Sequence, residues 1–403
     1  MLAACTIVSR NYLHFARTLC QSFLAVHPGA AFYVLLVDRP GADEDLRDEP
    51  FTPVWVEELG IPDFLSVAFK YGILELNTNV KPSFLKWILS RHGVERLVYL
   101  DPDIFVYSGL GEIDERLRET DIVLTPHMLS PIRDDRSPAE QDFLRVGVFN
   151  LGFIGVSNRQ PAREFLDWWE TRCLSLGYLE QRSGLFVDQK WINFAPCFFP
   201  GVGIIRDPGC NVAYWNLHER TIDVKDDRFQ VNGSSALKFF HFSGIDLDDI
   251  DRISKHQNRF TLRDRGDLAP LFEAYRREVR KNGSLAPTGA RYAFGYFSNG
   301  VLITELARRV YAIAPGRFAG QDPFDADGEV FSYARRAGLL SKTDRSGSYG
   351  ALDVDPGDWR LRLVHGCLRL VRFVLGPDRY TMLMRYLGYI SILRNQRPLF
   401  WRD

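Results

Sequence analysis

Short runs of apolar, β-forming residues alternate along the chain with longer segments in which apolar positions recur every three or four residues. This alternation predicts an α/β fold, in which helices flank a mostly parallel central sheet. Ala16, Leu19, Cys20 and Phe23, for example, form the i, i+3, i+4, i+7 stripe of a helix that lies on a sheet. Strands are expected at Ala4–Val8, Phe32–Val37, Val54–Val56, Leu97–Leu100, Asp121–Leu124, Gly152–Ser157, Gly203–Arg206 and Leu237–Phe242, and helices at Tyr12–Val26, Pro82–Arg91, Pro161–Leu176 and Val187–Phe194.

The pattern changes after residue 245. Helices are expected at Leu268–Arg280 and Gly300–Ile313, separated by a connector at Gly283–Ser298 that is rich in glycine and aromatic residues. Residues 314–358 are rich in Gly, Pro, Asp and Ser, which indicates a linker or loop. We therefore predict a catalytic domain over residues 1–260 and a mainly helical C-terminal region over residues 261–403.

Residues 359–403 hold nine Arg and two Asp among apolar residues at helical spacing. The pattern predicts two basic amphipathic helices, broken at Gly376–Pro377. Two interpretations remain open. The apolar faces could cap the catalytic domain, which we favour, or they could contact the inner face of a membrane.

Composition narrows the class of protein. The chain has 403 residues, 46% hydrophobic and 25% charged, with a net charge of −1, which is typical of a globular protein without a field that attracts nucleic acid. Its six cysteines are scattered and form no C-x-x-C pair, so buried free thiols in a reducing cytoplasm are expected. We expect neither a signal peptide nor a membrane-spanning helix.

Two acidic residues follow the apolar run Leu97–Leu100 directly. Side chains two positions apart on an extended chain point to the same side, so Asp101 and Asp103 can converge, and Pro102 between them ends the strand. Carboxylates held this close repel unless a cation lies between them. A divalent metal site is the first hypothesis, and a turn that is merely rich in Asp is the alternative.

Several motifs together resemble one family. In order, they match the motifs of retaining glycosyltransferases of the GT-A fold, family-8 type, which include bacterial lipopolysaccharide galactosyltransferases and glycogenin-like enzymes. The resemblance covers about residues 4 to 260 and does not reach the C-terminal third. The motifs are Ser9-Arg10-Asn11-Tyr12, Asp101-Pro102-Asp103, Phe149-Asn150-Leu151-Gly152, Asp188-Gln189 on a helix, and His241-Phe242-Ser243-Gly244.

The resemblance implies that Asp101, Asp103 and His241 bind a divalent ion, which also holds the diphosphate of a nucleotide-sugar donor, expected to be UDP-linked. Two carboxylates and one imidazole suit Mn²⁺ better than Mg²⁺. The ion would neutralise the charge that builds on the leaving nucleoside diphosphate. The alternative for His241 is a hydrogen-bonded core residue, because its neighbours along the chain are phenylalanines.

The resemblance also implies donor contacts. The residues assigned to the donor are Ser9, Asn11, Tyr12, Lys81, Asp101, Asp103, Asn150, Gly152, Gly244 and Lys255. Three of them have alternative roles. Asn11 could be only the N-cap of the first helix, Lys81 a solvated lysine at a helix start, and Gly152 a residue that allows close backbone approach.

Asp188 and Gln189 carry the implied mechanism. In the resembled family the aspartate binds sugar hydroxyls, and the next residue lies near the anomeric carbon. Glutamine is a poor nucleophile, so retention would proceed by front-side attack with the Gln189 carbonyl steadying an oxocarbenium-like centre. The alternative is an ordinary helix start with Asp188 in its first turn.

The chain departs from the family in one place. The usual Lys-Pro-Trp after His-x-x-Gly is replaced by Ile245-Asp246-Leu247, and Lys255 could supply the missing cation by folding back. Residues 130–137 are polar and long enough for a mobile active-site flap. Residues 211–218 combine polar and aromatic side chains, as acceptor sites for sugars do.

The predicted function is a cytoplasmic, metal-dependent glycosyltransferase that moves a sugar from a nucleotide diphosphate to the hydroxyl of a glycan, lipid-linked or protein acceptor, with retention, in surface polysaccharide or glycoconjugate synthesis. One alternative is an inverting GT-A transferase in which Asp188 is the general base. The other is a catalytically silent module that binds carbohydrate or nucleotide.

Overall fold

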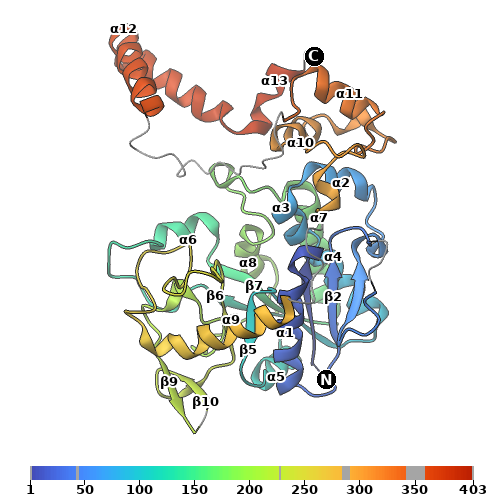
Figure 1. The fold of residues 1–403 in the computed structure, drawn as a ribbon, viewed down its shortest axis with the longest axis vertical. Coiled ribbons are helices and arrows are strands. Elements are labelled where there is room, and N and C mark those ends of the chain that lie inside the picture. Colours follow the sequence, from blue (N-terminus) through green and yellow to red (C-terminus); the bar gives the residue numbers. More distant parts are fainter. Residues whose placement is uncertain (1, 42–44, 227, 284–290, 342–358, 402–403) are drawn as a thin grey trace. The chain divides into compact units, whose positions relative to one another are not determined.

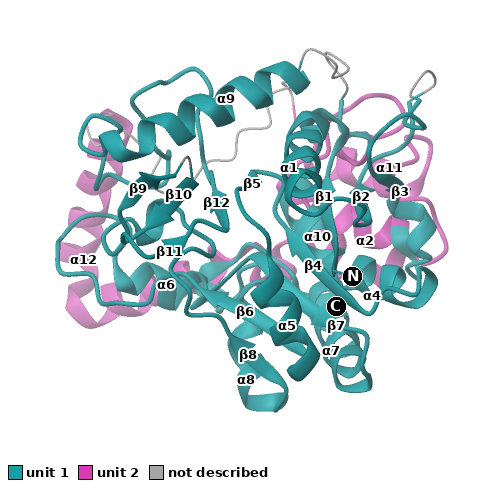
Figure 2. Ribbon diagram, turned by 90° about the horizontal axis from the view of Figure 1, so that it is seen from below, with its two compact units in different colours: residues 1–64, 73–293 teal, residues 65–72, 294–403 magenta. Residues whose placement is uncertain are grey.

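The structure is a computed structural model that describes residues 2–41, 45–226, 228–283, 291–341 and 359–401 (Figure 1). The chain forms two compact units, and each is built from two separate stretches of sequence (Figure 2). Unit 1 comprises residues 1–64 and 73–293, and unit 2 comprises residues 65–72 and 294–403. All of the predicted site residues therefore belong to unit 1.

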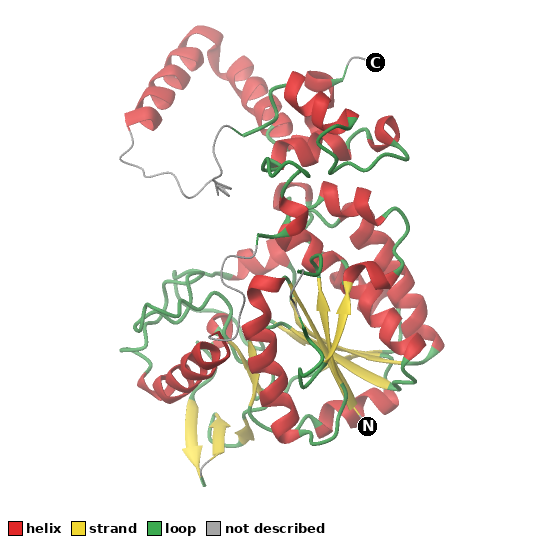
Figure 3. Ribbon diagram, turned by 45° about the vertical axis from the view of Figure 1, so that its right-hand side comes forward, coloured by secondary structure: helices red, strands yellow, loops and turns green. Residues whose placement is uncertain are grey.

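Unit 1 is organised around a seven-stranded sheet with the strand order β3-β2-β1-β4-β7-β6-β8. Only the β4–β7 and β6–β7 pairs are antiparallel, so β7 runs against the other six strands. Helices lie on both faces of the sheet, whose strands are yellow in Figure 3. The predicted α/β fold with a mostly parallel sheet is confirmed. The strands are β1 (Leu2–Val8), β2 (Phe32–Leu36), β3 (Thr52–Trp55), β4 (Arg96–Leu100), β6 (Ile122–Pro126), β7 (Phe149–Ser157) and β8 (Val202–Ile204).

The central strand β1 is buried along its whole length. A strand covered on both faces reads as a continuous apolar run, which is why it could be recognised in the sequence. Successive side chains point to opposite faces. On one face, Ala4 and Val8 belong to the same apolar cluster as Ala16, Leu19 and Phe23 of the first helix. The predicted stripe of that helix is therefore the surface that packs on the sheet.

Two smaller sheets complete unit 1. A two-stranded sheet pairs β5 with β12, and a three-stranded sheet has the order β11-β10-β9. The strands β9, β10 and β11 contain two to four residues each, too few for an alternating pattern to predict them. The strands are β5 (Ile104–Val106), β9 (Ile222–Lys225), β10 (Arg228–Val231), β11 (Ser235–Ala236) and β12 (Phe239–His241).

The helix predicted at Val187–Phe194 begins only at Lys190 and is a 3₁₀ helix. Val187 has φ +41°, in the left-handed region that a right-handed helix cannot include, and a 3₁₀ turn at Lys190–Phe194 follows it. Asp188 and Gln189 therefore precede the helical segment. The helices of unit 1 are α1 (Leu13–Val26), α3 (Ile73–Asn79), α4 (Lys81–Arg91), α5 (Gly111–Glu119), α6 (Glu140–Val146), α7 (Gln160–Leu176), α8 (Ala195–Phe198) and α9 (Ala269–Gly283).

Unit 2 is helical and is built around the short helix α2. The ring of Phe69 on α2 is fully buried and contacts the rings of Phe297, Tyr311 and Phe324. The buried guanidinium of Arg308 donates hydrogen bonds to carbonyl oxygens at the end of α2, including that of Phe69 at 2.8 Å. Arg308 thus satisfies carbonyls that have no partner within the helix. The helices of unit 2 are α2 (Phe64–Lys70, which begins one residue before the unit), α10 (Glu305–Ala312), α11 (Glu329–Arg336), α12 (Trp359–Ile390) and α13 (Arg397–Phe400).

The region after residue 300 differs from the prediction in two places. The helix expected at Gly300–Ile313 begins only at Glu305, because the hydroxyl of Thr304 accepts a hydrogen bond from the Ala307 N–H and caps it. The part of the expected linker that the structure describes, residues 314–341, contains α11, whose Phe331 packs on Phe297. The Gly-rich and Asp-rich surroundings hid this short helix. The rest of the expected linker, 342–358, lies outside the described residues, as do 284–290 of the expected connector.

Two basic helical halves are present in α12 as expected. The helix is interrupted at Gly376, which has φ +73° and ψ 170°, and Pro377 opens the second half. The predicted break at this dipeptide is confirmed.

Candidate functional site

The Asp-x-Asp motif lies where β4 leaves the sheet. The Asp101 N–H donates to the Gly152 carbonyl of β7 at 2.8 Å, and the Ile104 N–H donates back to the Asp101 carbonyl at 3.0 Å, which closes a turn around Pro102. The chain then continues as β5. The two carboxylate side chains, at 30% and 28% exposed, remain open to solvent.

His241 reaches the same place from a distant part of the sequence. Antiparallel pairing of β12 with β5 sets His241 opposite Ile104, and the Phe242 N–H donates to the Asp103 carbonyl at 2.9 Å. The neighbouring rings of Phe240 and Phe242 belong to the apolar core, whereas the imidazole faces the acids. Pairing between two short strands therefore brings a third ligand type to the Asp-x-Asp motif.

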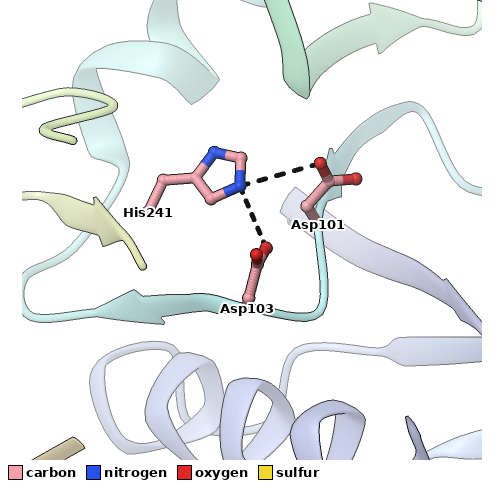
Figure 4. A group of neighbouring side chains, drawn as sticks. All are labelled: Asp101, Asp103 and His241. Carbon is pink, nitrogen blue, oxygen red and sulfur yellow. Dashed lines mark ion pairs between the residues drawn. The ribbon is translucent and has the colours of Figure 1, made fainter. Parts of the chain in front are cut away.

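The three side chains form one cluster (Figure 4). His241 Nε2 lies 2.9 Å from an oxygen of Asp103 and 3.8 Å from an oxygen of Asp101, and one ligand atom of each residue lies within 4.8 Å of the others. Burial lowers the pKa of His241, but the charges of Asp103 and Asp101 outweigh burial, so the pKa is raised above its ordinary value. The imidazole is therefore stabilised in its cationic form, in the position where the two acids need a positive charge.

This donor set fits a divalent ion. Two carboxylate oxygens and an imidazole nitrogen are ligands that Mn²⁺ accepts readily, and the partly exposed acids leave further coordination positions on the solvent side. Two acids and one histidine are also the only such group found among the described residues. The prediction that Asp101, Asp103 and His241 come together is borne out by the geometry.

Gly152 and Asn150 line the inner side of this cluster. A Cβ on Gly152 would lie 2.4 Å from Cε1 of His241 and 2.8 Å from Oδ1 of Asn150, so only glycine fits there. Asn150 is nearly buried, and its Oδ1 accepts hydrogen bonds from the Gly152 N–H at 3.2 Å and from the Asn211 amide at 3.0 Å. The backbone of β7 at Gly152 thus packs against the imidazole of His241.

Lys81 and Asp188 form a second charged group, which is sealed from solvent. The ammonium of Lys81 lies 2.7 Å from the carboxylate, and both side chains are only 2% exposed. Burial raises the pKa of Asp188, and the adjacent Lys81 opposes that rise. Lys81 also donates to the Leu151 carbonyl at 2.8 Å. The alternative of a solvated lysine at a helix start is therefore wrong.

Tyr99 connects the two charged groups. Its hydroxyl donates to Asp101 at 2.6 Å, and the Lys81 ammonium lies 4.1 Å from the centre of its ring. The side chain alternates with the core positions of β4, so it points to the same side as Asp101. The orientation of one metal-ligand candidate is thus tied to the buried ion pair.

Gln189 lies against the start of β7. Its side-chain oxygen accepts from the Leu151 N–H at 3.0 Å, and its side-chain nitrogen donates to the Val146 carbonyl at 3.2 Å. The amide is 7% exposed and fixed at both ends. Gln189 is therefore bound to the backbone on either side of Asn150, at Val146 and at Leu151.

The residues predicted to meet the nucleotide follow β1, the parallel neighbour of β4, and therefore lie at the same edge of the sheet as Asp101. The Ser9 hydroxyl donates to the Asn11 side chain at 2.6 Å, and the Tyr12 ring is 49% exposed and stacks on Phe15. Asn11 is not the N-cap of α1, because a 3₁₀ turn at Arg10–Tyr12 precedes that helix. The capping alternative for Asn11 is wrong.

Gly244 and Lys255 lie side by side. Gly244 has φ +70°, and a Cβ there would lie 2.5 Å from Cδ2 of His256. The Lys255 N–H donates to the Gly244 carbonyl at 2.9 Å, and the Lys255 side chain is exposed. The chain after Gly244 therefore folds back as expected, while a contact between Lys255 and a diphosphate stays a prediction.

The expected flap at residues 130–137 is held in place. Arg259, whose side chain is 3% exposed, donates to both oxygens of Asp134 at 2.8 and 2.9 Å and to the Pro138 carbonyl at 2.9 Å. The Asn258 N–H donates to the Ser137 carbonyl at 3.1 Å. These contacts join the loop to the segment that follows Lys255.

Sequence reasoning missed His127. It lies just beyond the end of β6, fully buried, with Nε2 3.3 Å from the Asn150 amide. Burial lowers the pKa of His127 to about 3, so the ring is neutral. Asn211, with φ +54°, ties Asn150 to Thr125 of β6. A polar residue directly after a buried strand, which identified Asp101, would also have identified His127.

Comparisons with known proteins give the following likenesses. No protein-family model matches the chain. Uncharacterized protein YfnF of Bacillus subtilis (strain 168) is 27% identical over 277 residues, which are 68% of this chain and 90% of that protein. Uncharacterized protein YfnD of the same organism is 29% identical over 248 residues, 60% of this chain and 77% of that protein. The solved structure of the galactosyltransferase LgtC with donor and acceptor sugar analogs aligns with a TM-score of 0.43 at 15% identity, covering 72% of this chain and 98% of that one.

Proposed function

We propose that the chain is a metal-dependent glycosyltransferase that transfers a sugar from a nucleotide diphosphate sugar to a hydroxyl acceptor. The observation that carries this proposal is the convergence of Asp101, Asp103 and His241 at the carboxyl edge of the sheet. The motif order along the chain adds the resemblance to GT-A transferases. Neither feature alone is specific, because acidic clusters and α/β sheets occur in many proteins.

The proposed ligands are the two acids and the imidazole, and the proposed ion is Mn²⁺. When bound, such an ion supplies positive charge against the diphosphate as the glycosidic bond breaks. The chain's own contribution is positioning. Tyr99 fixes one oxygen of Asp101, and Gly152 leaves room for the ring of His241.

The finer parts of the proposal follow the resemblance. The donor is UDP-linked and is bound by Ser9, Asn11 and Tyr12 at the end of β1. Asn150 contacts the sugar. Lys255, exposed beside Gly244, supplies the cation that the missing Lys-Pro-Trp would have provided.

Retention is proposed because of the residue type of Gln189 and the burial of Asp188. Gln189 has no carboxylate with which to form a glycosyl-enzyme, and Asp188 is buried against Lys81, which disfavours its use as a general base in an inverting reaction. Gln189 and Asp188 would instead position the donor sugar for front-side attack. The acceptor is a hydroxyl of a glycan, lipid-linked or protein substrate, and the location is cytoplasmic, in keeping with six free cysteines.

The test is slow hydrolysis of nucleotide sugars in the absence of acceptor. A panel of UDP-, GDP- and ADP-sugars is incubated with the full chain and Mn²⁺, and nucleoside diphosphate release is measured with and without a chelator. The proposal predicts metal-dependent release from one or a few UDP-sugars. Binding of a donor, seen as thermal stabilisation, without any turnover would instead support a silent binding module.

Stereochemistry is tested separately once a donor and an acceptor are known. Proton NMR of the first-formed product should show the same anomeric configuration as the donor. The opposite anomer would overturn retention while leaving the metal-dependent transfer intact.

A further inference from the structure

The helix α12 exposes an unusual amount of apolar surface. None of its 32 described residues is buried, and large side chains protrude, with Phe373 87% exposed and Leu370 64% exposed. Contiguous apolar surface of this extent on a globular protein marks a contact with another apolar phase or molecule. Other exposed apolar side chains on α12 are Trp359, Leu363, Val364, Val374, Leu375, Met382, Met384, Tyr386, Leu387 and Tyr389.

The first half of α12 has two distinct faces. Arg362, Arg369 and Arg372 recur at i, i+7 and i+10, with His365 at i+3, and form a narrow basic stripe. The rest of the circumference is apolar except for Arg360, which lies in the first turn of the helix on the side opposite the stripe. Such a helix can rest its apolar side in a hydrocarbon boundary while its arginines stay at the level of polar headgroups.

The helix is suited to lie along a bilayer rather than to cross it. The first half, residues 359–375, is about 25 Å long at 1.5 Å per residue, and the break at Gly376 follows it. In the part of the chain that the structure describes, no helix combines the length and the apolar character needed to cross a bilayer. Trp359 and Tyr389, near the two ends of α12, are residue types that concentrate at membrane interfaces.

Charge identifies the surface that α12 fits. Residues 359–403 hold nine Arg and two Asp and no Lys or Glu, a formal charge of +7, whereas the whole chain has −1, so residues 1–358 carry −8. A second copy that met α12 with its own α12 would bring a like charge against these helices. An anionic lipid surface offers both the negative potential and the apolar boundary that the two faces require.

We propose that α12 docks the protein on an anionic lipid bilayer, with its apolar faces in the interface and its arginines at the headgroups. The inference is independent of the proposed reaction, because it rests on unit 2 alone. If both hold, the enzyme works at the surface where the hydroxyls of lipid-linked glycans are presented.

The test is co-sedimentation of the full chain with vesicles. Vesicles of phosphatidylcholine that contain about 30% of the anionic lipid phosphatidylglycerol are compared with vesicles of phosphatidylcholine alone. Binding is expected to the anionic vesicles only. It should weaken as the salt concentration rises from about 0.1 to about 0.5 M, because the Debye length is about 10 Å at 0.1 M and shorter at higher salt.

Two variants probe the two faces. The double variant Leu370→Asp with Phe373→Asp removes apolar contact, and Ile250→Asp, which replaces a 70% exposed residue of unit 1, is its control. The variant R362E/R369E/R372E reverses the stripe, and R47E/R263E/R277E makes the same change of net charge at exposed arginines elsewhere. Each α12 variant should weaken binding at least about tenfold, and each control should bind like the wild type.

Several results would overturn the inference. Absence of wild-type binding, equal binding to both vesicle types, or unchanged binding by the α12 variants would each reject it. A dimer in sedimentation velocity that dissociates in the Leu370→Asp/Phe373→Asp variant would show instead that α12 joins two copies. Melting temperature and nucleotide-sugar hydrolysis without vesicles are measured for every variant, so that failure of the proposed reaction is recognised separately.

Discussion

Unit 1 contains two groups of acids and bases that look alike in sequence and differ in the structure. Asp101, Asp103 and His241 combine partly exposed carboxylates with a buried imidazole. Lys81 and Asp188 are both buried and neutralise each other at 2.7 Å. The first group has acidic oxygens open to solvent, and the second is an ion pair closed to solvent. Exposure, rather than residue type, distinguishes the two groups.

The largest expected effect comes from removing an open acid. Asp103→Asn keeps the size of the side chain but removes one ligand charge, so metal-dependent hydrolysis should fall by about a thousandfold or more. Stopped assays at saturating Mn²⁺ measure the rate. The matched control is Asp248→Asn, a 97% exposed aspartate, which should retain the wild-type rate. Equal rates in both variants would place the chemistry elsewhere.

The closed pair should behave differently, by affecting folding as well as activity. Lys81→Met leaves the Asp188 carboxylate buried without its partner, which should lower the free energy of unfolding by about 3–5 kcal/mol. Urea titration measures the loss. The double variant Lys81→Met/Asp188→Leu should recover part of it, because no charge then remains unpaired. The exposed pair of Arg47 and Asp45 is the control, and breaking it should leave the urea midpoint unchanged.

A substitution at Gly152, which packs against the ring of His241, should have a smaller effect. Gly152→Ala would force a Cβ to within 2.4 Å of the His241 ring, so either the ring or β7 must move, at a cost of about 1–3 kcal/mol. The affinity for Mn²⁺ should fall at the same time. Gly111→Ala, at a position with no neighbour within 4 Å, is the control and should change neither quantity appreciably. Unaltered metal affinity in Gly152→Ala would separate His241 from the metal site.

The smallest expected effect tests the other buried histidine. The pKa of His127 is about 3 in the folded chain and about 6.5 when unfolded, so the unfolded state binds more protons between these values. Stability is therefore lost as pH falls below about 6.5, by at most about 1.4 kcal/mol per pH unit from this group. His127→Gln should reduce that slope in urea titrations from pH 6 to pH 5. The exposed His365→Gln should not, and an unchanged slope in His127→Gln would mean that the ring is already protonated.

The features that the sequence predicted well are those with strong local signals. The apolar run of β4 followed by Asp101 and Asp103 identified both a strand and its functional end. The pairing of β12 with β5 could not be predicted from residues 239–241 and 104–106 alone, because each strand has only three residues. The resemblance supplied His241 instead.

Other features depended on tertiary contacts that no local pattern reveals. The left-handed Val187 removes the expected helix start, and the buried partnership of Lys81 with Asp188 joins residues that are more than a hundred positions apart. The helix α11 was hidden among turn-forming residues. Arg259, an ordinary arginine in the sequence, fixes the loop at Asp134 only because the fold brings the two together.

The central claim is that the open acids and His241 hold a divalent ion. Crystals soaked with Mn²⁺ and UDP, with data collected at the manganese absorption edge, test it directly. The account predicts one anomalous peak within about 2.5 Å of oxygens of Asp101 and Asp103 and of a nitrogen of His241. A peak at another place, or these three side chains unchanged and without a peak, would contradict it.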